Sequence, residues 1–261
     1  MEFDLEDPIS CFKENQTCSI SELFASESDY MPSPNHLSSA DFHVSFRCEV
    51  SVIQVHFSCN LDPFVSYLAI NYLDRFMSRQ EIPRLQQENS WFLRVIVIAC
   101  LSLASKMKNT PFSLSDFQKE GYIFDARSIQ KMELLILGAL EWRMRSITPF
   151  PFLHFFISVS KLNDPSVKQA LKIRASEIIL NTHSDIKFSE YKPSIIAASA
   201  LISASHELFP LQYSTLRASV LACEYLDEEI LSKCFNFIQE LKIQANASVI
   251  DTSLRAQKQR I

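Results

Sequence analysis

Glycine is almost absent from this chain: Gly121 and Gly138 are the only two among 261 residues. A phosphate-binding loop or a GxGxxG dinucleotide turn needs several glycines close together, because the backbone must approach the ligand closely. A GxSxG nucleophile turn needs a glycine on each side of the serine. The two isolated glycines therefore exclude these classes of catalytic site.

Metal-binding and redox motifs are also missing. None of the six histidines begins an HExxH motif, and none of the seven cysteines lies in a CxxC motif. We therefore expect no metal ion or organic cofactor, and we expect buried thiols in a reducing compartment. The acidic N-terminus lacks the apolar segment of a secretion signal, so export is not expected.

Basic residues are in deficit, with 25 Lys and Arg against 30 Asp and Glu and a net charge of −5. A broad nucleic-acid surface needs a basic face or stripe. We therefore expect no direct nucleic-acid partner.

Long apolar runs are scarce as well. The most apolar stretch, Trp91–Met107, carries only Arg94 and Lys106 as charges, and its uncharged run is Val95–Ser105. A membrane-spanning helix needs about 20 predominantly apolar residues. Small residues within the run favour close packing against other helices. We predict a central core helix here, in preference to a membrane span, and expect no membrane partner.

Helical patterns account for most of the chain that follows. Asp62-Pro63 and Asp164-Pro165 each predict a helix start, because an Asp side chain caps a first turn and proline suits its first position. Thr148-Pro149 and Lys192-Pro193 start helices by the same proline preference. Further helices are predicted at 46–57, 113–119, 126–140 and 227–243. No stretch predicts a reliable pair of strands, so the predicted fold class is all-α.

Parts of two helices recur in the same order in the second half of the chain. The matches are Asp62-Pro63-Phe64-Val65 with Asp164-Pro165-Ser166-Val167, and Leu101, Ala104 and Ser105 with Leu201, Ala204 and Ser205. Chance is the alternative, because the identities are few. A duplicated five-helix unit would leave this pattern.

Composition divides the chain into four parts. Residues 1–43 are polar, acidic and marked by proline and serine, which predicts a disordered N-terminal arm. Residues 44–145 and 146–244 are the two predicted helical units, and 245–261 is expected to be a flexible tail. Ser33, followed by Pro34, is a candidate phosphorylation site for a proline-directed kinase, although this dipeptide more often marks a turn.

Several runs together resemble the plant D-type cyclins. They are YLAINYLDRFMS, ACLSLASKM, QKMELLILGALEWRMRSITPFPFLHFFIS, LFASESDYMPSPNHL, DIKFSEYKPSIIAASAL and ELFPLQ. The resemblance covers residues 22 to 240 and is closest to the divergent subgroup that lacks a retinoblastoma-binding motif. It implies two tandem cyclin folds of five helices each and a cyclin-dependent kinase as partner.

The resemblance also implies a kinase-binding pair. In the family, a Lys at the end of the third helix and a Glu on the fifth bind the mobile C-helix of the kinase, and these positions are Lys106 and Glu133. The residues alone leave an alternative, in which Lys106 extends into solvent and Glu133 pairs locally, because a desolvated carboxylate without a partner is costly.

Two more features follow from the resemblance. Arg47 and Asp74 are expected to form a structural ion pair. Leu93 and Arg94 fall in a candidate substrate-docking patch, although the first helix lacks the Trp that family members carry there. The Leu-x-Cys-x-Glu motif is missing, so direct binding to the retinoblastoma pocket is not expected.

The functional prediction is a regulatory subunit without a catalytic centre. It would activate a cyclin-dependent kinase at the G1/S transition, in the nucleus and also the cytoplasm, with kinase inhibitors and kinase substrates as candidate partners. Two alternatives remain: a cyclin-fold scaffold that does not activate a kinase, and a transcription-factor-like protein with tandem cyclin folds.

Overall fold

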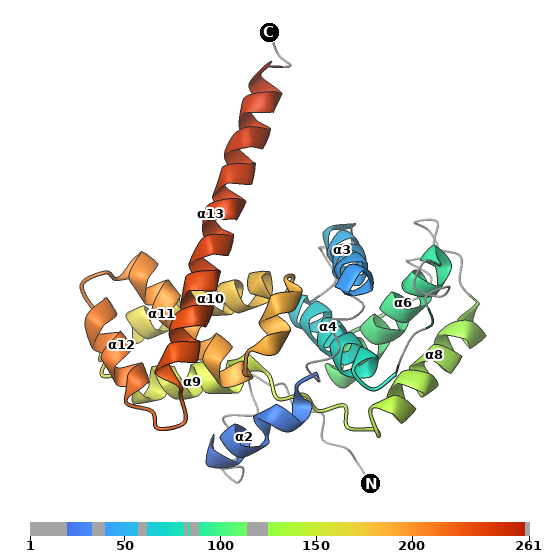
Figure 1. The fold of residues 1–261 in the computed structure, drawn as a ribbon, viewed down its shortest axis with the longest axis horizontal. Coiled ribbons are helices and arrows are strands. Elements are labelled where there is room, and N and C mark those ends of the chain that lie inside the picture. The colour runs from blue at the N-terminus through green and yellow to red at the C-terminus, as the bar shows by residue number, and fades with distance from the viewer. Residues whose placement is uncertain are drawn as a thin grey trace. The chain divides into compact units, whose positions relative to one another are not determined.

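The computed structural model describes residues 20–32, 40–56, 62–80, 83, 89–113 and 125–258, and every regular element within these ranges is a helix (Figure 1). The chain forms two compact units. Unit 1 comprises residues 1–148 and 183–192, and unit 2 comprises residues 149–182 and 193–261. The all-α prediction and the tandem arrangement are confirmed.

Unit 1 is built around helix α6 (Ser90–Met107), the predicted central helix. It packs against α3 (Ala40–His56), α4 (Pro63–Met77) and α8 (Ala126–Ala139). Its length and composition would allow it to cross a membrane. All of its residues from Val95 to Ser105 are nevertheless buried within the unit. This burial is what a core helix requires.

Unit 2 is built around helix α11 (Pro193–Leu208), whose residues from Pro193 to Ser205 are all buried. Its neighbours are α9 (Pro149–Val159), α10 (Pro165–Thr182), α12 (Tyr213–Leu221) and α13 (Glu228–Lys258). Helices α9, α10 and α11 begin at prolines, as the sequence predicted.

The sequence repeat corresponds to a structural repeat. Asp62 Oδ1 accepts a hydrogen bond from Phe64 N at 2.9 Å at the start of α4, and Asp164 Oδ1 accepts one from Ser166 N at 2.8 Å at the start of α10. The other matched residues lie in the two central helices α6 and α11, and all of them are buried. Small residues at these positions let neighbouring helices approach closely.

The N-terminal region is more ordered than expected at the residues that the structure describes. Helix α2 (Ile20–Ser26), the 3-10 helix η1 (Glu27–Tyr30) and the start of α3 fall within the range predicted to be disordered. Phe24 and Glu27 are buried in this segment, so it contributes to packing despite its polar composition. Ser33 lies outside the described residues, and its modification stays a prediction.

The two compact units are not continuous in sequence. The first unit ends at Thr148, and residues 183–192, which contain the 3-10 helix η3 (Ile186–Glu190), belong to unit 1 although α10 and α11 on either side belong to unit 2. The ring of His183 stacks on Tyr67 at a centroid distance of 3.8 Å. The sequence of residues 183–192 does not indicate which of the two units this segment packs against.

The sequence-based prediction missed one helix, α12, and made another, α13, too short. Helix α12 was not predicted, because it has nine residues and only Leu216 and Val220 of them are buried. Helix α13 continues to Lys258 where a flexible tail was expected from 245, and Figure 1 shows it extending past the other helices of its unit. The tail sequence has no Gly or Pro to stop it. The predicted helix at 113–119 lies almost wholly outside the described residues.

Candidate functional site

Lys106 and Glu133 form a close ion pair at the edge of unit 1. Lys106 Nζ lies 2.8 Å from Glu133 Oε1 and 2.7 Å from Oε2. The Lys106 side chain is 61% exposed and that of Glu133 11%. The pair is therefore reachable from solvent through the ammonium group, while the carboxylate is held against the protein.

Helix α8 explains why Glu133 is so well buried. Its buried stripe consists of Ile129, Glu133 and Ile136, which recur at helical spacing. A carboxylate on this stripe needs a charged partner, because its desolvation is costly. Lys106, in the last turn of α6, supplies that partner. The alternative of local pairing by Glu133 is not what the structure shows, because its partner is Lys106, 27 residues away on α6.

Exposed apolar side chains occur on the same helix and just beyond it. Leu134 is 55% exposed, Leu135 53% and Trp142 67%. Glu141 and Trp142 both have positive φ angles, 54° and 62°, which cost of order 1 kcal/mol or more for residues with side chains. Unit 1 holds this strained turn while leaving a tryptophan in solvent. Aromatic residues such as tryptophan are enriched in protein–protein interfaces.

The expected ion pair between Arg47 and Asp74 is present in the interior of unit 1. Arg47 Nη2 donates to Asp74 Oδ2 at 2.7 Å, and His43 Nδ1 lies 3.0 Å from Asp74 Oδ1. Both side chains of the Arg–Asp pair are 3% exposed. Burial opposes ionisation of Asp74, but the Arg47 guanidinium and the His43 hydrogen bond outweigh it and lower the carboxyl pKa to about 2. The pair fastens α3 to α4 and is not a surface for ligands.

Arg75, the residue after Asp74, has a separate structural role that sequence reasoning missed. Its guanidinium donates to Ser146 Oγ at 3.0 Å and to the carbonyl oxygen of Arg143 at 2.7 Å, and it lies 5.2 Å from the centroid of the Tyr30 ring. Burial lowers its pKa to about 10. An Asp-Arg dipeptide in an apolar helix was the available signal, because two adjacent charges there must point to different buried partners.

The candidate substrate-docking residues are placed differently from each other. Leu93 is partly buried and packs against the core of unit 1, so it offers little surface to a ligand. Arg94 is 48% exposed, with its Nε 3.6 Å from Glu49 Oε1. Trp91, in the first turn of α6, is 49% exposed. An exposed tryptophan therefore lies near the start of α6, whereas α3, the helix expected to carry a Trp in the docking patch, has none.

Among the residues that the structure describes, no group of three His, Cys, Asp or Glu side chains is placed to hold a metal ion. The four cysteines placed there, Cys48, Cys100, Cys223 and Cys234, are all free. Burial raises the pKa of the Cys234 thiol to about 12, so this group is held as an unreactive thiol.

Comparisons with known proteins match both halves of the chain. The family model described as "Cyclin, N-terminal domain" matches residues 19–145, and "Cyclin, C-terminal domain" matches residues 147–259. The putative cyclin-D6-1 of Arabidopsis thaliana is 40% identical over 93% of this chain and 84% of its own length. Cyclin-D6-1 of Oryza sativa subsp. japonica is 36% identical over 89% of this chain and 72% of its own length.

A solved structure supports the fold. The viral cyclin from herpesvirus saimiri superposes with a TM-score of 0.61 at 18% sequence identity, covering 77% of this chain and 83% of the viral one. At this identity the likeness concerns the helical architecture alone.

Proposed function

Because the chain belongs to the cyclin family, among the plant D-type cyclins, we propose that it binds a cyclin-dependent kinase through Lys106 and Glu133 and activates it. The observation that supports this proposal is the doubly hydrogen-bonded pair between these two residues, in which the ammonium group is exposed and the carboxylate is 11% exposed. The exposed cation marks the place at which a ligand would meet the carboxylate behind it.

The pair has the hydrogen-bonding capacity that a helix end requires. An ammonium group has three N–H donors, and at most two of them serve the two Glu133 oxygens. The remaining donor would bind a backbone carbonyl of the kinase helix. The Glu133 oxygens keep lone pairs that would accept from backbone N–H groups of the same helix. Backbone contacts of this kind position a helix without depending on its side chains.

Activation then follows from a shift of population. A protein kinase is competent when a Glu of its C-helix meets the Lys that contacts the ATP phosphates. A partner that binds the inward position of this helix better than the outward one shifts the kinase toward the competent state. Leu134 and Trp142, both exposed, would add apolar contacts to the same docked surface. The cyclin therefore contributes binding energy and no catalytic group.

The test is co-purification of the chain with a co-expressed cyclin-dependent kinase. Replacing Lys106 and Glu133 together by Ala should lower kinase capture at least tenfold, since charged hydrogen bonds of this kind contribute roughly 1.5–3 kcal/mol each. The matched control is Lys233→Ala with Glu229→Ala, which removes an exposed ion pair of 2.6 Å from α13. Full kinase capture by the first double variant, with helical content unchanged, would refute the assignment.

Activation is tested separately from binding. The purified complex should phosphorylate a histone or retinoblastoma peptide, whereas the kinase alone should not. A complex that forms without activity would instead identify a cyclin-fold scaffold.

Place and timing are part of the same proposal. We propose that the complex acts in the nucleus, and also in the cytoplasm, at the G1/S transition, with kinase substrates and inhibitors as further partners.

Arg94 is the more accessible of the two docking candidates, because Leu93 contributes to the core. Arg94→Ala should weaken phosphorylation of protein substrates that dock there and leave short peptides unaffected. Equal loss for both substrates would contradict a docking role.

A further inference from the structure

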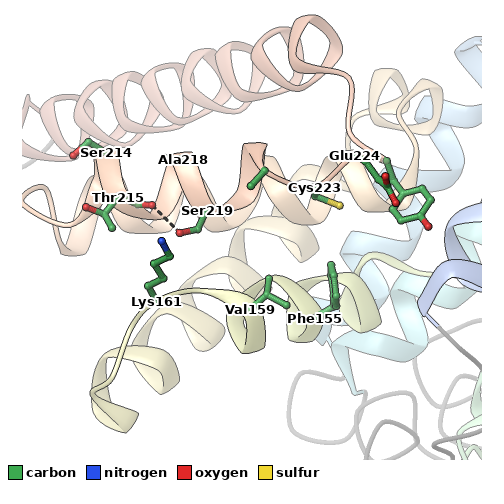
Figure 2. A pocket seen from close by; sticks show the side chains of 11 residues that line it. Phe155, Val159, Lys161, Ser214, Thr215, Ala218, Ser219, Cys223 and Glu224 are labelled. Atoms are coloured by element: carbon green, nitrogen blue, oxygen red, sulfur yellow. Dashed lines mark hydrogen bonds between the residues drawn. The ribbon is translucent and has the colours of Figure 1, made fainter.

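Unit 2 carries an open groove between α9 and α12 that the proposed kinase contact, in unit 1, does not use. Its volume is about 830 Å³. Figure 2 shows side chains of both helices along it. All of the lining residues belong to unit 2, so the groove is complete within one compact unit.

The two walls of the groove differ in composition. Phe155 and Val159, one helical turn apart on α9, form an apolar wall, and Val159 is 48% exposed. Ala218 on α12 and Ala222, the C-cap residue one turn further on, form the opposite wall together with the hydroxyl residues Ser214, Thr215 and Ser219. Both walls therefore repeat with the period of an α-helix. Apolar grooves of this kind accept the apolar face of an amphipathic helix.

Opposite charges mark the two ends of the groove. Lys161, just after α9, lies beside Ser219 at one end, and Glu224, just after α12, lies at the other (Figure 2). A helix has a partial positive charge at its N-terminus and a partial negative charge at its C-terminus. A helix in the groove is therefore stabilised when its N-terminus lies near Glu224 and its C-terminus near Lys161. Its axis then runs antiparallel to α12 and parallel to α9, so the dipoles of the two walls largely cancel and the charges at the two ends set the orientation.

We infer that this groove binds an amphipathic helix of a third protein, distinct from the kinase, in an orientation antiparallel to α12. The complementary ligand carries apolar residues on one face, a basic residue in its first turn and an acidic residue in its last turn. Helix α12 has nine residues, so the contact extends over roughly three turns of the ligand. A scaffold protein or a substrate would then contact residues other than the Lys106–Glu133 pair.

The probe is a synthetic, fluorescein-labelled helical peptide of about 14 residues, or four turns. It carries leucines on one face, arginine in the first turn and glutamate in the last. Fluorescence anisotropy with the full chain should give saturable binding. Ala218 is exposed, so Ala218→Trp fills the groove at little risk to folding, and it should weaken binding by about tenfold or more.

Charge reversal tests the orientation. Lys161→Glu should weaken binding of this peptide roughly threefold, as expected for an exposed ion pair. A second peptide, with lysine in place of the terminal glutamate, should bind the Lys161→Glu variant better than the original chain. The control is Lys233→Glu on α13, outside the groove lining, which should bind both peptides as the original chain does.

Three outcomes would overturn the inference. The first is that the peptide shows no saturable binding at about 1 mM, and the second is that the Ala218→Trp variant binds the peptide as tightly as the original chain does. The third is that the chain self-associates and that both the peptide and Ala218→Trp abolish this association, which would make a second copy the occupant. Kinase capture by Ala218→Trp should stay normal. The groove and the kinase contact can therefore fail independently.

Discussion

Replacing Asp74 by Ala is expected to destabilise unit 1 by about 3–5 kcal/mol, because it leaves a buried cation without its partner. The structure sets this magnitude. Arg47 and Asp74 are each 3% exposed, and the 2.7 Å bond between them is the shortest polar contact of either side chain. Water cannot readily replace the carboxylate at such burial. The stranded Arg47 is therefore the main source of the cost, with the lost volume of the carboxylate second.

Two further variants separate charge from packing. Asp74→Asn keeps the volume and one acceptor oxygen but removes the charge, so its loss should be smaller than that of Asp74→Ala. The double variant Arg47→Met, Asp74→Leu removes both charges and should recover part of the stability, because a hydrophobic replacement of a buried ion pair is often neutral. Recovery is incomplete because buried His43 loses its contact with Asp74.

Unit 1 has its own spectroscopic signal. The only two tryptophans, Trp91 and Trp142, both lie in it, so urea unfolding followed by tryptophan fluorescence reports this unit, while circular dichroism reports both. A midpoint for Asp74→Ala that matches the original chain would refute the buried-pair reasoning. So would a double variant less stable than Asp74→Ala alone.

Acidity gives a second test, on a different residue. Burial, together with the nearby Arg47, lowers the pKa of His183 to about 4 in the folded state, whereas an unfolded histidine titrates near 6.5. Between these two pH values only the unfolded state takes up the proton, so the free energy of unfolding decreases as the pH falls. The loss reaches roughly 3 kcal/mol at pH 4. His183→Phe keeps a ring against Tyr67 and should flatten urea midpoints between pH 6.5 and 4, whereas an unchanged slope would assign it to other groups. For the N-terminal segment, Tyr30 lies within 5.2 Å of Arg75 and 5.1 Å of Arg143, and each cation–π contact contributes roughly 0.5–2 kcal/mol. Tyr30→Leu should therefore speed amide hydrogen exchange in α2 and η1 relative to α12, and equal protection in both proteins would show that the arginines do not hold the segment.

Much of the architecture is local in origin, and for that reason it could be predicted. The central helix α6, the proline starts of α9 and α11 and the Asp caps of α4 and α10 follow from residues a few positions apart. Their physical causes, capping geometry and helical periodicity, act within one or two turns. The absence of glycine motifs excluded phosphate-loop chemistry by equally local reasoning.

The sites depended on more than local pattern. The resemblance to a family singled out Lys106 and Glu133, but only the packing of α6 against α8 brought the ammonium within 2.8 Å of both carboxylate oxygens and left it exposed. Arg75 and His183 were missed because their partners lie far away in the chain, at Ser146 and Tyr67.

Sequence determined the helices that carry strong capping or periodic signals, because neighbours along the chain set those signals, but it did not predict α2 or α12. Tertiary structure alone decided which charges meet and which grooves stay open. It also assigned residues 183–192 to unit 1, although the helices on either side belong to unit 2. Contacts between distant segments depend on how whole helices pack, and no short stretch of residues specifies that packing.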